Sequence, residues 1–249
     1  MHDTRPIGLV ALALAFVAAT AIAAGTWKSV RGKPAERKIR ITGSAKKRIK
    51  SDLIEWSATV DAHAADRTAA YKQLHVGVEE AVAFLKKQGI KPDEIEPQSA
   101  NFKQVFETQI TGTGPTRVEK QIPNGFNTTE VILVRSNDVA RIEKASREVT
   151  SLLEAGVSIS SAEPLYYYTR LGELKLEMLA AAGRDARSRA DNILRSTGGG
   201  SIGKLLGADM GIININPANS TQTSEQGNND TSSLEKDIIT IVHADYELN

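Results

Sequence analysis

The 249-residue chain contains no cysteine, four histidines and few aromatic residues. The absence of cysteine excludes a disulfide framework, a thiolate metal site and a cysteine nucleophile. The histidines are scattered, so we predict neither a histidine-rich metal centre nor a cofactor; they are His2, His63, His75 and His243. The apolar fraction of 41% and the charged fraction of 24% are ordinary for a globular protein, which excludes a wholly disordered chain and a multi-span membrane protein.

None of the 19 residues from Ile7 to Gly25 has a charged side chain. A helix of this length rises about 28 Å, close to the roughly 30 Å hydrocarbon core of a bilayer. One alternative is a cleaved signal peptide occupying residues 1–27, for which Ala21-Ile22-Ala23 supplies a small-x-small cleavage site. The full apolar length and the interfacial Trp27 favour the other alternative, an uncleaved anchor. We therefore predict a signal anchor that contacts the membrane from Ile7 to Gly25.

A basic linker, residues 28–37, follows the apolar segment and continues into the first predicted strand. Ten basic residues and one acidic residue, Glu36, lie between Lys28 and Lys50. Basic residues beside a membrane span can bind anionic headgroups, although an ordinary solvated linker accounts for them equally well. We expect no nucleic-acid partner, because no aromatic residues interleave with these charges. The positive-inside rule would keep the basic residues in the cytoplasm, which conflicts with a body outside it, so charge alone leaves the orientation open.

The rest of the chain, residues 38–249, predicts one α+β domain: a two-layer body of largely antiparallel sheet with about three helices. A duplicated pair of subdomains is the alternative, although no segment repeats well enough to establish it. Alternation of apolar and polar residues is cleanest at 53–62, where Ile54, Trp56, Ala58 and Val60 would face a core. Steps of three and four residues predict helices, and they place Tyr71 on the apolar stripe of the first helix and Ile193 on that of the third. The predicted strands are 38–45, 53–62, 101–110, 126–135, 157–169, one within 202–215, and 238–248. The predicted helices begin near Asp66, Asp138 and Glu173 and end before Gly89, Gly156 and Gly198.

Two segments predict loops. Residues 111–125 are rich in turn-forming residues, and residues 216–233 are rich in Asn, Ser, Thr and Gln without apolar periodicity, which is typical of a mobile loop. Between them, Tyr166, Tyr167 and Tyr168 place aromatic groups on both faces of one strand. That arrangement favours a contact between subunits over a ligand platform.

No motif predicts catalysis. The segment from Gly198 to Leu205, GGGSIGKL, has the spacing of a phosphate-binding loop, but Leu205 replaces the required Ser or Thr, and its glycines end a predicted helix instead of opening one. His63 and His243 have no evident ligand partners, and no base accompanies Ser44 or Ser51. A hydrolase that uses Ser44 or His63 is the least favoured alternative, and we predict no catalytic, cofactor-binding or metal-binding residue.

Several segments together resemble the SIMPL-domain family of bacterial envelope proteins, a domain of unknown function. They are ITGSAKKRIKSDLIEWSATV, FLKKQGIKPDEIEPQSANF, GFNTTEVILVRSNDVARIEKASREVTSLLEAGV, AAGRDARSRADNILRSTGGGSIGKL and ITIVHADYEL. The resemblance covers residues 38–249 and implies an exported α+β protein without established enzymatic chemistry. Some relatives assemble into ring-like or channel-like oligomers, and others are linked to oxidative-stress defence.

These observations lead us to expect a non-catalytic protein of the cell envelope. It would be tethered to the bacterial inner membrane by one span, with its body in the periplasm, and would form a homo-oligomer. A soluble periplasmic protein after leader cleavage is the alternative location. The alternative function is binding of a small molecule, of unknown identity, in a cleft near the 111–125 and 216–233 loops, since long loops often carry function.

Overall fold

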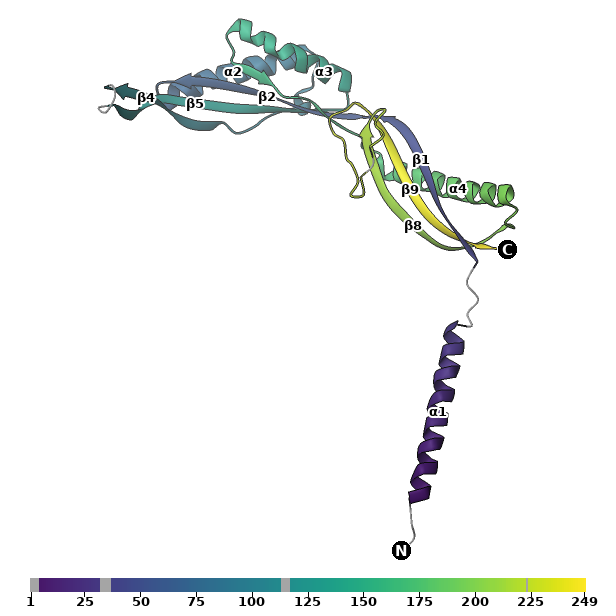
Figure 1. Ribbon diagram of the computed structural model, residues 1–249. Coiled ribbons are helices and arrows are strands. Elements are labelled where there is room, and N and C mark those ends of the chain that lie inside the picture. The colour runs from purple at the N-terminus through teal and green to yellow at the C-terminus, as the bar shows by residue number, and fades with distance from the viewer. Residues whose placement is uncertain (1–4, 32–36, 113–116, 223) are drawn as a thin grey trace. The chain divides into compact units, whose positions relative to one another are not determined.

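The computed structural model describes residues 5–31, 37–112, 117–222 and 224–249, and within the first of these segments it describes the side chains of residues 14–27. The described residues form four α-helices and two antiparallel sheets, whose main elements are labelled in Figure 1. The elements are α1 (Arg5–Arg31), β1 (Lys38–Lys50), β2 (Leu53–Ala64), α2 (Arg67–Lys87), η1 (Pro92–Glu94), β3 (Ile95–Pro97), β4 (Asn101–Thr111), β5 (Val118–Ser136), α3 (Val139–Glu148), η3 (Val149–Ala155), β6 (Ile159–Ser161), β7 (Leu165–Tyr167), α4 (Leu171–Thr197), β8 (Ile202–Pro217) and β9 (Glu235–Leu248). The predicted α+β class is confirmed.

The segment predicted to contact a membrane lies within α1, which is 27 residues long. The first part of that prediction, Ile7 to residue 13, falls outside the side chains that the structure describes. Among the described side chains, no helix combines the length and the hydropathy needed to cross a membrane. Those described on α1 are nevertheless apolar and largely exposed, with exposed fractions of 70% for both Phe16 and Ile22.

The described chain forms two compact units, and each unit consists of separate segments. One contains the residues up to Gly43 together with Gly183–Met210 and Val242–Asn249, and the other contains Ser44–Ala182 and Gly211–Ile241. The elements β1, β8, β9 and α4 contribute residues to both units.

The larger unit is built on a six-stranded sheet in which β2 pairs antiparallel with β5, from Ile54 opposite Ser136 to Ala64 opposite Phe126. The predicted alternation along β2 is confirmed: Ile54, Trp56, Ala58 and Val60 are buried, while the residues between them are partly exposed. Helices α2 and α3 cover that buried face (Figure 1). Burial of each large apolar side chain contributes about 1.5–3 kcal/mol to the free energy of folding. The buried side chains of this face form the core of the larger unit.

Helix α2 begins where the sequence predicts, because the Asp66 carboxylate accepts a hydrogen bond from the Ala69 backbone N–H at 2.9 Å. Its buried stripe includes Leu74, Val78 and Leu85. Tyr71, which was assigned to the same stripe, is 47% exposed and lies parallel to the ring of His75. That assignment was wrong because Tyr71 lies near the start of α2, at the margin of the buried stripe.

The second sheet has the strand order β1-β9-β8, and α4 packs against it. Within the smaller unit, Ala186 and Ala190 of α4 contact Ala244 and Tyr246 of β9. Alanines allow the helix backbone to approach the sheet closely. Ile193, which was assigned to the buried face of this helix, is 43% exposed, so that assignment was wrong.

Two other expectations were wrong. The predicted strand at 157–169 consists of two three-residue strands, β6 and β7, separated by residues 162–164, which include Pro164. Residues 118–125 were predicted to be loop but form the first part of β5. Val118 and Ile122 lie on the same face of this strand, but Lys120 stands between them and interrupts the apolar alternation. Pro123 and the Asn124-Gly125 pair also favoured a turn.

Candidate functional site

The residues considered for hydrolysis lie on different sheets. Ser44 is exposed on β1 of the three-stranded sheet, whereas His63 lies at the end of β2 in the six-stranded sheet. His63 Nδ1 is 2.6 Å from Asn127 Oδ1, and His243 Nδ1 is 3.0 Å from Thr42 Oγ1. Among the residues that the structure describes, no three metal-ligating side chains are placed to hold one ion.

The GGGSIGKL segment ends a helix, as the sequence predicts. Helix α4 ends at Thr197, Gly198 has a φ of 66° and Gly200 a φ of 94°, and β8 starts at Ile202. Positive φ values of this kind are typical of glycine after a helix C-terminus. The backbone N–H groups of a helix N-terminus are therefore not aimed at this segment, and the arrangement is not a phosphate-binding loop.

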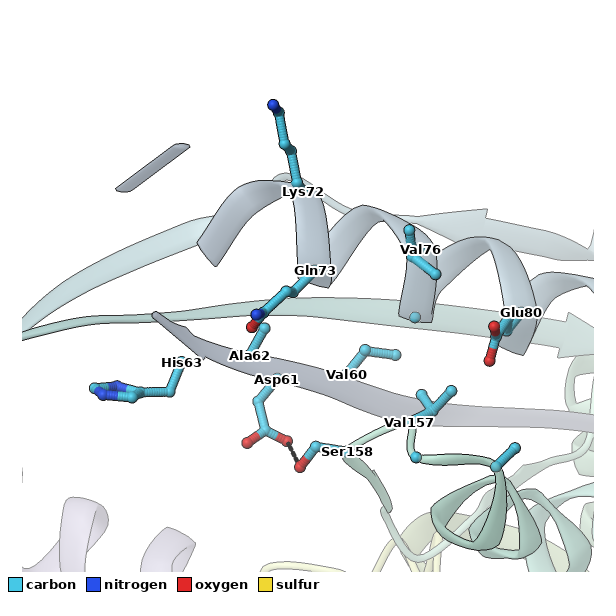
Figure 2. A pocket seen from close by; sticks show the side chains of 13 residues that line it. Val60, Asp61, Ala62, His63, Lys72, Gln73, Val76, Glu80, Val157 and Ser158 are labelled. Carbon is cyan, nitrogen blue, oxygen red and sulfur yellow. Dashed lines mark hydrogen bonds between the residues drawn. The ribbon is translucent and has the colours of Figure 1, made fainter. Parts of the chain in front are cut away.

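A groove of about 680 Å³ lies beside α2, over the end of β2 (Figure 2). Its apolar surface comes from Val60 and Ala62 of β2, Val76 of α2, and Val157. Helix α2 comes very close to the strand here, because a β-carbon on Gly77 would lie 3.0 Å from Val60 Cγ1 and 3.3 Å from Val157 Cγ1. Val76 remains 53% exposed, so the groove has an apolar wall that no described side chain covers fully.

The rim of the groove carries charge of both signs. Asp61 accepts a hydrogen bond from Ser158 Oγ at 2.8 Å, and its backbone N–H donates to the Ser158 carbonyl oxygen at 3.0 Å. Lys72 extends away from the strand, whereas Gln73 points toward Ala62 (Figure 2). The groove lies where β6, which pairs with β2 only from Ala58 to Val60, has ended. Neither of the two loops that the sequence favoured for ligand binding lines it.

Four exposed apolar side chains of the larger unit lie close together on the β4–β5 hairpin. We call residues 104–112 and 117–125 the hairpin arm, because β2 ends opposite Phe126 and only β4 and β5 pair beyond that point. The exposed fraction is 52% for Phe106, 53% for Ile110, 62% for Val118 and 37% for Ile122. Cross-strand partners share a face, so Phe106 and Ile110 lie on one face of the arm, and Val118 and Ile122 lie on the other.

An isolated two-stranded ribbon is marginally stable in water, and exposed apolar residues on an unpaired strand are a template for pairing with another chain. Strand β8 is a second such edge, since it is the last strand in the order β1-β9-β8. Its exposed apolar residues are Leu205, Leu206, Met210 and Ile212. Sequence reasoning missed both surfaces because it assigned strands without determining which of them end a sheet.

The segment at 216–233 differs from the mobile loop predicted for it, because buried side chains hold its described residues in place. Asn214 Oδ1 accepts hydrogen bonds from the backbone N–H groups of Ser224 (3.0 Å) and Asn228 (3.1 Å). Asn216, 1% exposed, donates to the Gln222 carbonyl oxygen at 2.6 Å and accepts from Asn228 at 2.8 Å. Polar composition suggested solvation, but these side chains replace water with backbone hydrogen bonds.

Two buried charges complete the attachment of this segment. Lys236, 1% exposed, donates from Nζ to the Asp230 carbonyl oxygen at 2.5 Å and to Asp230 Oδ2 at 3.2 Å. Burial lowers the pKa of the Lys236 ammonium, and the bonds to Asp230 act against that change. Asp237 accepts from Arg48 Nε at 2.9 Å and from the Asn219 backbone N–H at 2.8 Å, and Lys46 Nζ lies 3.0 Å away. The hydrogen bond from Arg48 is the main reason that the pKa of Asp237 lies far below its usual range, although burial opposes this.

Two of the three consecutive tyrosines pack in different cores of the larger unit. Tyr166 packs against the core formed by β2, β5, α2 and α3, and its O–H donates to Glu143 Oε1 at 2.7 Å. Burial, followed by this hydrogen bond, raises the pKa of Tyr166 to about 12. Tyr168 packs against a second core that contains Ile49, Leu174 and Ile238. Tyr166 and Tyr168 therefore belong to two different packed interiors of the same unit.

The described residues define an α+β protein with two antiparallel sheets. Residues 39–240 match the family model SIMPL, described as a protein of unknown function (DUF541). The match covers most of the sequence, and the chain belongs to the SIMPL family. A comparison with curated proteins finds no match.

Proposed function

We propose that this protein is a membrane-tethered, non-catalytic component of the cell envelope that acts by assembling with further copies of itself. The observation that carries the proposal is the hairpin arm. Its two strands present Phe106, Ile110, Val118 and Ile122 to solvent on both faces, and β4 has an outer edge along which no described strand pairs. Covering these side chains and pairing this edge would stabilise an assembly through apolar burial and backbone hydrogen bonds.

The membrane tether is α1, in which the residues from Ile7 to Gly25 carry no charge. Exposed apolar side chains along this helix, such as Phe16 and Ile22, are favourable in a lipid environment and unfavourable in water. The basic residues that follow would lie near the headgroups of the bilayer. The body would lie on the extracytoplasmic side, as the family resemblance implies.

Assembly is tested by measuring the molar mass of the full chain in detergent by light scattering during size-exclusion chromatography. We expect a particle that contains two or more copies at micromolar concentration. The control is Ile110→Lys together with Val118→Lys, which places a charge on each face of the arm and should lower the mass. A strictly monomeric wild-type chain would overturn the assembly proposal.

Sidedness is tested with a cysteine introduced at Glu163, an exposed position between β6 and β7. Because the chain has no cysteine of its own, any labelling reports on that position. An impermeant maleimide should label the variant in cells whose outer membrane is opened and whose inner membrane is intact. Labelling only after the inner membrane is also permeabilised would place the body in the cytoplasm and contradict the proposal.

A second candidate function is binding of an extended apolar peptide in the groove beside α2. The observation in its favour is the uncovered wall of Val76 next to the part of β2 beyond Val60, where β6 no longer pairs. The test is a thermal-shift measurement with acetyl-Val-Thr-Val-amide. A rise in the unfolding temperature that is lost in Val76→Glu would support the function, and no rise at millimolar peptide would count against it.

A further inference from the structure

The outer edge of β4 is regular along its whole length. The register of the hairpin changes between Gln104 and Phe106: β4 advances two residues while β5 advances three, from Phe126 to Pro123. The extra residue therefore lies on β5, where Gly125 has a φ of 82°. Pro123 also removes one N–H group from β5. Of the two free edges of the arm, β4 is thus the one that another strand could join without interruption.

We propose that two copies of this chain pair along β4 as antiparallel strands, about a two-fold axis that passes between the two copies of Thr108. The inference rests on the proposed function, since it requires assembly, and it specifies the surface and the register. It would convert two two-stranded ribbons into one four-stranded sheet with the order β5-β4-β4-β5. A sheet of that size with apolar residues on its faces is more stable than either ribbon alone.

This register matches the side chains of β4 to one another. Phe106 faces Ile110 of the second copy, Ile110 faces Phe106, and Thr108 faces Thr108. Aromatic with β-branched pairs and Thr with Thr pairs are favourable on neighbouring antiparallel strands. On the opposite face, Glu107 lies opposite the uncharged Gln109, so no carboxylate faces another carboxylate. A two-fold interface requires a self-complementary surface of this kind.

Neighbouring registers match less well. If the axis passed through Gln109, Ile110 would face Thr108, and the apolar pairs would be lost. If it passed through Phe106, Ile110 would face Phe102, whose ring already contacts the Arg67 guanidinium at 5.1 Å and neighbours Tyr71, with ring centroids 6.3 Å apart. In the register about Thr108, Phe106 and Ile110 pair with each other, and Phe102 keeps its contacts with Arg67 and Tyr71 of α2.

The test uses single cysteines in the full chain, which has none of its own. The positions are Thr108→Cys, Glu107→Cys and Gln109→Cys, all at exposed side chains of β4. Directly opposed residues of antiparallel strands have Cα atoms about 4.5–5.5 Å apart, within the range of a disulfide. We expect T108C to form a covalent dimer under mild oxidation. E107C and Q109C should each remain largely uncross-linked alone and should form a dimer when the two variants are mixed.

Each outcome decides the proposal. Cross-linking of T108C and of the E107C and Q109C mixture, with little in either single variant, would establish both the edge and the register. Cross-linking of E107C alone to the same extent as the mixture would overturn the register. If neither T108C nor the mixture cross-links while the wild type has the mass of several copies, assembly stands and the β4 pairing is wrong. A monomeric wild type would overturn both.

Discussion

The carbonyl oxygen of Ala64 lies only 2.3 Å from the position that a β-carbon on Gly125 would occupy. Gly125 also has a φ of 82°, in the region that favours glycine. Ala64 is the last residue of β2, so this close approach marks the point where β5 leaves β2 and continues into the hairpin arm. The absence of a side chain at one position therefore permits the transition from the sheet to the arm.

Gly125→Ala should destabilise the larger unit by roughly 1–3 kcal/mol, because it combines a steric clash with an unfavourable backbone conformation. The measurement is urea unfolding of the full chain in detergent, followed by the fluorescence of the buried Trp56. The control is Gly172→Ala in α4, where a β-carbon would meet nothing within 4 Å and φ is not positive. An equal effect of both substitutions would contradict the role assigned to Gly125.

Thr128 and Thr240 are both fully buried but differ in their hydrogen bonding. Thr128 Oγ1 donates to the Asn101 carbonyl oxygen at 2.9 Å, whereas Thr240 Oγ1 has no hydrogen-bond partner among the described residues. Thr128→Val should destabilise the larger unit by about 1–2 kcal/mol, because it removes a hydrogen bond. Thr240→Val should leave the stability unchanged or raise it, because it removes an unpaired polar group. Each variant serves as the control of the other in urea unfolding. Destabilisation by T240V to the same extent as T128V would refute the explanation.

Asp237→Asn should lower the stability of the larger unit by about 2 kcal/mol at neutral pH, since it weakens the charge-assisted bonds from Arg48 and Lys46. The folded-state pKa of Asp237 is lowered, so its contribution is fully present above the unfolded pKa of about 3.9 and is lost as the pH falls through the folded value. The stability difference between wild type and D237N should therefore be constant from about pH 7 to 5 and shrink in stronger acid. Asp209→Asn, at an exposed position of β8, is the control. A difference that grows on acidification would contradict this assignment.

Tyr166→Phe should destabilise the unit by about 1 kcal/mol through loss of the bond to Glu143. Because the folded-state pKa of Tyr166 is raised to about 12, the stabilisation is present below the ordinary tyrosine pKa of about 10 and is lost as the pH rises through the folded value. In ultraviolet titration at about pH 11, the folded wild type and Y166F should show the same tyrosinate absorbance. Tyr71→Phe, which alters a half-exposed ring, is the control and should cause no comparable loss of stability.

Local patterns predicted most of the elements correctly. Asp66 and Asp138 accept hydrogen bonds from the first turns of α2 and α3, and Gly156 and Gly198 end helical segments with positive φ. The alternation along β2 identified the residues of the main core, because a strand with one buried face must alternate. These features depend on residues a few positions apart, and a sequence contains that information directly.

The candidate sites depended on pairing between distant segments. Nothing near Phe106 or Ile110 in the sequence indicates that β2 ends opposite Phe126 and leaves the hairpin arm without a third strand. Likewise, the polar residues at 216–233 gave no sign that Asn214, Lys236 and Asp237 would be buried beneath them.

The sequence by itself determined the capping residues of the helical segments, the buried face of β2, the uncharged segment within α1 and the family resemblance, since each is a local pattern or an ordered set of local patterns. It did not determine that the segment after Asp138 changes from an α-helix to a 3-10 helix at Val149. Tertiary structure alone decided which strands form the edges of sheets, which polar groups exchange water for backbone partners, and where a groove remains open beside α2. The physical reason is that exposure and hydrogen-bond satisfaction are properties of the neighbours that folding brings together, and those neighbours are far apart along the chain.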